Sequence, residues 1–179
     1  MKIAHFADVH FRGLARHSEY RTAFEDAFKS LREISPDLIY IGGDIVHSKT
    51  QGITPELIEI LGWWFESLAE IAPVDVLLGN HDGLIMNKNR LDAISPIISA
   101  LNNPRIRLLK NSGTFPTVNP EVSFCVFSLF DQAGWEKVTP DPGKINIALY
   151  HGSVKGAVSD LDFELEGEIS TSFFEKYDF

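Results

Sequence analysis

Lys2-Ile3-Ala4-His5-Phe6-Ala7-Asp8-Val9-His10 decides how the sequence is interpreted, because an apolar, strand-like run ends there in a carboxylate and an imidazole. On an extended segment, Asp8 and His10 project to the same side and can bind one cation together. Similar endings follow three later apolar runs, at Gly42-Gly43-Asp44, Gly79-Asn80-His81-Asp82 and Tyr150-His151-Gly152. In an α/β sheet, the loops that follow the strands gather along one edge, which is the usual place for a site. We therefore expect the four motifs to meet.

The polar residues of these motifs suit a metal centre. Aspartate, histidine and asparagine offer oxygen and nitrogen ligands without a thiolate, which favours Mn, Fe or Zn in a catalytic site over a structural zinc site. Asp44 follows two glycines and is placed to bridge two cations, while Asn80 offers a carbonyl oxygen and His151 an imidazole. Two metals roughly 3.5–4 Å apart would polarise a phosphoryl group and generate a hydroxide nucleophile.

His81 directly follows the candidate ligand Asn80, so it is predicted to act on the reacting phosphate by protonating the leaving oxygen. Asp82 is the candidate that orients it. Taken alone, each motif would be read as a solvated loop. Four motifs in order, each after a strand-like run, favour chemistry.

Length and composition indicate one domain, residues 1–179, with a good core. The net charge of -9 argues against a broad basic surface for nucleic acid, but it does not exclude a phosphodiester, because two divalent metals would dominate the local field. Cys125 is the single cysteine and reads as a core residue in a protein of a reducing compartment. Without a signal-peptide core or an apolar run of membrane-spanning length, we expect a cytoplasmic protein that makes no membrane contact.

The hydrophobic pattern predicts an α/β chain, with strands at 3–7, 38–41 and 74–78 and helices at 18–34, from Thr54-Pro55, and at 90–101. In the third helix, Pro96 would kink or split the pattern. Strands at 105–109, 122–130 and 145–150 follow, separated by turns that contain proline or glycine. A short helix is expected from Ser170 or Thr171, and Tyr177-Asp178-Phe179 then starts another strand, so the sequence looks truncated.

With these motifs in view, the chain resembles the calcineurin-like metallophosphoesterases, and within them the SbcD-type nucleases that repair DNA double-strand breaks, including phage versions. The closer resemblance rests on residues 2–10, on Gly43-Asp44-Ile45-Val46-His47-Ser48, and on Gly79-Asn80-His81-Asp82. It runs from Met1 to about Gly152. It implies a layered β-sandwich flanked by helices (α/β/β/α).

The resemblance also implies roles for individual residues. Asp8, His10 and Asp44 would hold one divalent metal, usually Mn, with Mg, Fe or Zn as alternatives. Asp44, Asn80 and His151 would hold the other, and His81 would be the catalytic histidine. The family's last motif, Gly-His-x-His, would fall just after Phe179, as would the capping domain and the helices that bind an SbcC-type coiled-coil ATPase. We therefore expect the 179-residue chain by itself to bind Mn weakly and to show little or no nuclease activity.

Other residues have two interpretations each. His47 matches a histidine of the nuclease branch and would support the site or touch substrate, or else it is a loop histidine with a local hydrogen bond. Arg12 would meet a phosphate, or else it is solvated. His5 reads as a core histidine. Trp63 and Trp64 cannot share one helix face, so one is predicted in the core and the other in a homodimer interface with the helix at 90–101, as in the nuclease branch.

The function predicted from the sequence is metal-dependent cleavage of DNA ends, as exonuclease and single-strand endonuclease in repair or recombination. A phosphatase or cyclic-nucleotide phosphodiesterase with a small substrate is the alternative enzyme. A catalytically inactive metal-site fragment is the alternative outside enzymes.

Overall fold

The computed structural model describes residues 1–47, 52–87, 90–158, 162, 164, 166–167 and 169–179. The chain divides into two compact units, Met1–Lys110 and Asn111–Phe179, and each is described here by itself. None of the helices in these residues is both long and apolar enough to cross a membrane.

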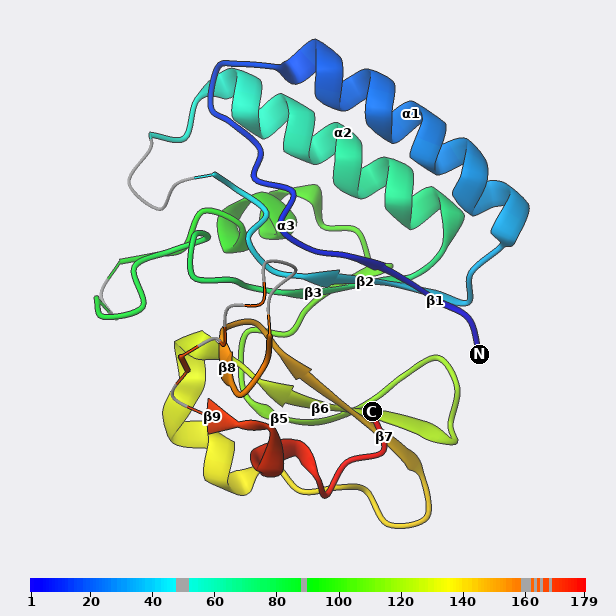
Figure 1. The fold of residues 1–179 in the computed structure, drawn as a ribbon. Coiled ribbons are helices and arrows are strands. Elements are labelled where there is room, and N and C mark those ends of the chain that lie inside the picture. Colours follow the sequence, from blue (N-terminus) through cyan, green and yellow to red (C-terminus); the bar gives the residue numbers. More distant parts are fainter. Residues whose placement is uncertain (48–51, 88–89, 159–161, 163, 165, 168) are drawn as a thin grey trace. The chain divides into compact units, whose positions relative to one another are not determined.

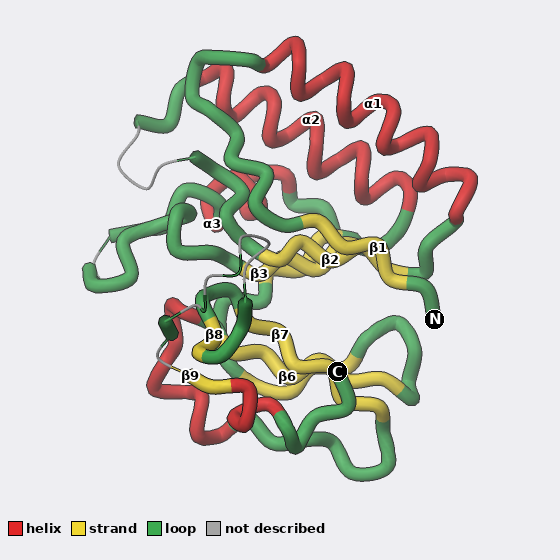
Figure 2. Tube along the Cα trace, in the orientation of Figure 1, coloured by secondary structure: helices red, strands yellow, loops and turns green. Residues whose placement is uncertain are grey.

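The first unit is built on a parallel sheet. Its strands, in spatial as well as chain order, are β1 (Ile3–Phe6), β2 (Leu38–Gly42), β3 (Val74–Leu77) and β4 (Ile106–Leu108). Two long helices, α1 (His17–Ile34) and α2 (Pro55–Ile71), lie side by side over one face of this sheet (Figure 1). Because every strand points the same way, the loops after β1, β2 and β3 all leave from one edge, as Figure 2 shows.

The helix boundaries follow local capping chemistry. The hydroxyl of Thr54 accepts a hydrogen bond from the Leu57 amide at 3.2 Å, so α2 begins at Pro55 as the sequence predicts. The third helix, α3 (Ser95–Leu101), differs from the expected span of 90–101. The Asp92 carboxylate accepts hydrogen bonds from the Ile94 and Ser95 amides, which delays the helix, and Pro96 therefore occupies its first turn and does not kink it.

An aromatic cluster forms the core between the helices and the sheet. Trp64 of α2 is fully buried, with its ring centroid 6.2 Å from that of Phe6 in β1 and 5.3 Å from that of Phe24 in α1. Trp63 is half-buried, under the Arg21 guanidinium and against Phe28. The structure thus assigns the core role to Trp64. His5 is exposed beside Tyr40, which corrects its interpretation as a core histidine.

The second unit contains a mixed sheet of β5 (Gly113–Pro116), β6 (Val122–Phe127) and β7 (Ile145–Tyr150). Strand β6 ends earlier than expected, because the Ser128 hydroxyl caps the 3-10 helix η1 (Leu129–Lys137). Short strands β8 (Val154–Lys155) and β9 (Ile169–Ser170) follow, then the 3-10 helix η2 (Thr171–Phe174). Strand β5 was not expected from the sequence, since its four residues include a glycine and a proline.

The C-terminal Phe179 forms backbone hydrogen bonds with β7 in the pattern of a parallel strand. The Phe179 amide donates to the Asn146 carbonyl at 3.3 Å, and the Ala148 amide donates to the Phe179 carbonyl at 2.7 Å. This agrees with the prediction that a strand starts at Tyr177-Asp178-Phe179. The two units together confirm the α/β class, while the packing of their sheets into a sandwich stays a prediction.

Candidate active site

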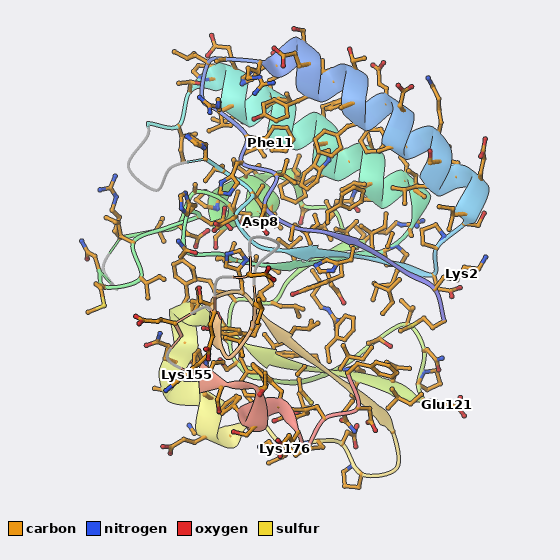
Figure 3. All side chains as sticks on the ribbon, in the orientation of Figure 1. Lys2, Asp8, Phe11, Glu121, Lys155 and Lys176 are labelled. Carbon is orange, nitrogen blue, oxygen red and sulfur yellow. The ribbon has the colours of Figure 1, made fainter. Side chains whose placement is uncertain are left out.

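The loops that follow β1 and β2 continue to pair beyond the strands. The Asp8, His10 and Phe11 amides donate in turn to the Gly43, Asp44 and Ile45 carbonyls, at 3.0, 3.0 and 2.8 Å. Phe11 is fully buried, with its ring 5.3 Å from that of Trp64. Figure 3 shows Phe11 towards the helices and Asp8 closer to the sheet. The aromatic core therefore anchors the segment that carries the first two candidate ligands.

The backbone at these ligands takes a conformation that L residues rarely adopt. Asp8, His10 and Asp44 have φ angles of 56°, 53° and 51°. Aspartate and histidine are among the side chains that tolerate this left-handed region, at a cost of about 1–2 kcal/mol each. Such strain persists only where the surrounding structure holds it, and it clusters at functional sites. Here the paired loops and the buried Phe11 provide that support.

A buried carboxylate ties the third loop to the second. Asp82 is fully buried, and its Oδ1 accepts hydrogen bonds from the Ile45 and Val46 amides at 2.8 and 3.0 Å. Its Oδ2 accepts from the Gly79 amide at 2.8 Å. Burial raises the pKa of Asp82 to about 7, and the three amide hydrogen bonds oppose that rise. Asp82 thus links the loop after β2 to the loop after β3.

These loops bring carboxylate and imidazole groups to one point. The Nε2 atom of His10 lies 3.8 Å from Oδ1 of Asp8 and 3.8 Å from Oδ2 of Asp44. That distance is too long for a hydrogen bond, but it suits atoms that share a cation at roughly 2.0–2.2 Å from each. His10, Asp44 and His81 also offer ligand atoms within 4.8 Å of one another. The residues present therefore fit a divalent metal.

His81 lies next to His10 and Asp44. Its ring centroid lies 4.9 Å from that of His10, and its amide donates to Oδ1 of Asp44 at 2.8 Å. Its Nδ1 atom lies 2.7 Å from the His47 carbonyl. A carbonyl only accepts, so Nδ1 carries the proton and Nε2 is left for chemistry. The His47 carbonyl therefore orients the His81 ring. The sequence had suggested Asp82 for this role, but the Asp82 carboxylate accepts hydrogen bonds from backbone amides instead.

Gly79 allows the close approach of the second and third loops. A Cβ atom at this position would collide with the carboxylate and the backbone amide of Asp44. The glycine of the third motif is thus explained by the space that the Asp44 carboxylate and amide need.

Two further candidate ligands, Asn80 and His151, lie in different units of the chain. Asn80 lies in the turn between Gly79 and His81, after β3 of the first unit. His151 follows β7 in the second unit, so its part in the metal centre stays a prediction. Ser48, which belongs to the second motif, lies outside the described residues.

An open pocket of about 690 Å³ lies in front of His10, His47 and His81. Arg12, Arg16 and the first residues of α1 also line it. His47 is exposed, and its pKa is lowered first by lost hydration around the ring and then by the positive charge of Arg12, with further contributions from the neighbouring His10 and His81. Arg12 and His47, the two supporting residues predicted from the sequence, therefore do line the same pocket as His81.

Tyr20, in the helix predicted at 18–34, was not among the site residues expected from the sequence. Its hydroxyl donates to the His10 carbonyl at 2.8 Å, and its ring centroid lies 4.7 Å from that of Phe11. Tyr20 thus holds the strained backbone of a candidate ligand from the helix side. Its helical spacing gave no signal for this contact, which depends on the tertiary structure.

Comparison with known proteins decides the family. Residues 1–178 match the family described as calcineurin-like phosphoesterase. The chain belongs to the calcineurin-like phosphoesterases. Members of this family hydrolyse phosphoesters with divalent metals, and the cluster of His10, Asp44 and His81 suits that chemistry. Membership of this family therefore suggests metal-dependent phosphoester hydrolysis.

A relative of this phosphoesterase domain is "Uncharacterized protein R555" of Acanthamoeba polyphaga mimivirus, which is 40% identical over 180 residues. The match covers 93% of this chain but 13% of that protein. The chain thus spans a small part of the curated relative it matches.

Replacing His81 by alanine should remove most phosphoesterase activity while metal occupancy persists, because the imidazole is held beside the metal ligands by the His47 carbonyl. A general acid contributes roughly 10²–10⁴-fold, so kcat should fall by that order in the full-length protein. Metal content by elemental analysis is the second measurement. If metal is lost together with activity, His81 is a ligand and the acid role must be dropped.

Proposed function

We propose that this phosphoesterase domain cleaves DNA as an SbcD-type exonuclease and single-strand endonuclease in repair or recombination. The observation that carries the proposal is that His47, the residue that matches a histidine of the nuclease branch, lines the same pocket as His81. Its carbonyl also holds the catalytic imidazole, at 2.7 Å. An open pocket with exposed Arg12 and His47 suits a polymer that passes across the site.

Each candidate residue has a role in this proposal. Asp8, His10 and Asp44 would hold one metal, and Asp44, Asn80 and His151 the other, with Mn as the preferred ion. When bound, the two metals would supply positive charge at the phosphoryl oxygens and an activated water. His81 would act as the general acid in its imidazolium form: the Nδ1 proton stays with the His47 carbonyl, the Nε2 proton passes to the leaving oxygen, and a neutral imidazole remains.

Partners follow from the same resemblance. DNA would be the substrate, and an SbcC-type coiled-coil ATPase the partner of the full-length protein. A homodimer through α2 near Trp63 and the segment 90–101 is also proposed. Trp63 is half-buried on α2, and Leu91 is 71% exposed, so apolar surface is present on both segments.

Cleavage of DNA by the full-length protein tests the proposal. Linear double-stranded DNA and circular single-stranded DNA separate exonuclease from endonuclease action, and each should be cut faster with Mn than with Mg. Bis(p-nitrophenyl) phosphate, a phosphomonoester and a cyclic nucleotide form the comparison set. Hydrolysis of the cyclic nucleotide or the monoester without DNA cleavage would favour the small-substrate enzyme, and no hydrolysis of any substrate would favour the inactive domain.

A further inference from the structure

The pocket in front of the histidines has a cationic wall. Arg12 and Arg16 line it together with His47 and His81, and Glu19 is the acidic residue among the pocket-lining residues that the structure describes. Glu19 is already paired with Arg16, with Nη2 of the arginine 2.6 Å from Oε2. In a chain with a net charge of -9, this wall therefore retains one uncompensated positive charge, that of Arg12.

The backbone of Arg12 is fixed although its side chain is exposed. The preceding residue, Phe11, is fully buried and forms an isolated parallel bridge with Val46. The ring nitrogen Nε2 of His17 lies 2.6 Å from the Arg12 carbonyl, which ties the residue to the start of α1. Within the described residues, the Arg12 guanidinium has no hydrogen bond or ion pair. The Arg12 side chain thus extends from a fixed backbone position into the pocket that His47 and His81 line.

The chemistry of this arrangement suits a second phosphate. The planar guanidinium donates two parallel hydrogen bonds to a phosphate, and it is always charged. Arg16 uses Nε and Nη2 towards Glu19, so it retains further donors on the same wall. In the proposed function the scissile phosphate would lie at the candidate metal ligands, so a substrate with a single phosphate would leave Arg12 unused.

We propose that Arg12, with Arg16 beside it, binds the phosphate next to the scissile one, so that the site prefers a nucleic-acid strand with at least two consecutive phosphodiesters over a substrate with one. The proposal rests on the proposed phosphodiesterase function and names its substrate class. Arg12 is a binding residue in it, and His81 remains the catalytic one.

Binding of a fluorescent oligothymidylate of twelve nucleotides to the metal-free full-length protein, in EDTA, tests the role of Arg12 without relying on activity. Arg12→Gln should weaken binding about three- to tenfold, which corresponds to one exposed charge-assisted contact. It should also reduce the slope of log K against log salt by about 0.7, the value for one phosphate contact on a single strand. Arg12→Lys keeps the charge and should restore that slope, but only part of the affinity.

Arg32→Gln is the matched control, because it removes the same charge from the far end of α1, where Arg32 is exposed. It should leave the affinity and the slope unchanged. If Arg12→Gln binds like the unmodified protein, or if Arg32→Gln weakens binding equally, the phosphate subsite is wrong.

The length of the substrate separates this subsite from the proposed function. With metal bound, the KM for the thymidine trinucleotide with two phosphodiesters should be several-fold lower than for the dinucleotide with one, and Arg12→Gln should remove most of that difference. Equal KM values, with both substrates cleaved, would overturn the subsite and leave the nuclease standing. Hydrolysis of bis(p-nitrophenyl) phosphate without cleavage of any DNA would overturn the nuclease, and the EDTA measurement would still decide on Arg12.

Discussion

Replacing Asp44 by asparagine should abolish metal-dependent phosphoester hydrolysis, with a loss of kcat on the order of a thousandfold, because several kcal/mol of transition-state stabilisation depend on the metal site. Oδ2 of Asp44 faces Nε2 of His10 at 3.8 Å, and an amide nitrogen there cannot serve as a ligand. Oδ1 accepts the His81 amide at 2.8 Å, and the asparagine oxygen can keep that bond. Kinetics with bis(p-nitrophenyl) phosphate and elemental analysis of metal content measure the effect.

The fold should survive this substitution, because a buried carboxylate is replaced by a neutral group of the same shape. We expect the melting temperature of the metal-free protein to stay the same or rise. Asp26→Asn, which removes an exposed carboxylate from α1, is the matched control and should retain activity. Normal activity and metal content in the Asp44 variant would show that this carboxylate does not bridge the metals.

Replacing Asp82 by alanine should destabilise the first unit on the order of 3 kcal/mol, because the amides of Ile45, Val46 and Gly79 would lose their acceptor inside the core. Each unsatisfied buried amide costs about 1–3 kcal/mol, and relief from burying the carboxylate offsets part of the sum. Chemical denaturation and thermal unfolding would measure it, with a fall in melting temperature of about 6–12 °C.

Asp37→Ala gives the control for Asp82. Asp37 is exposed and accepts one hydrogen bond, from the Lys2 amide at 2.7 Å, so its removal should cost less than about 1 kcal/mol. Metal affinity should fall in the Asp82 variant as well, since the loops that carry Asp44 and Asn80 lose their common anchor. Equal stability of the two variants would mean that water replaces the carboxylate.

Most elements could be predicted from the sequence because their signals are local. Helix α2 starts at Thr54-Pro55 because the Thr54 hydroxyl caps it and the proline ring suits its first position. The apolar runs at 3–7, 38–41 and 74–78 correspond to β1, β2 and β3. Strand β5 escaped prediction because its partners in β6 lie seven to thirteen residues away, and its own residues do not favour a strand. The start of α3 was misplaced because the cap from Asp92 competes with an apolar pattern that begins earlier.

The sequence by itself determined the types of candidate ligand and their order. A carboxylate, an imidazole or an amide at the end of a strand can be recognised from the few residues around it. Only the tertiary structure decided which side chains and backbone groups hold the candidate site residues in place. The Asp82 carboxylate binds amides 36 and 37 residues away, the Tyr20 hydroxyl holds the His10 carbonyl, and the His47 carbonyl orients His81. Backbone carbonyls and amides are present at every residue, so a sequence carries no mark of the few that become partners. Their selection follows from the register of parallel strands and from the helices packed over them.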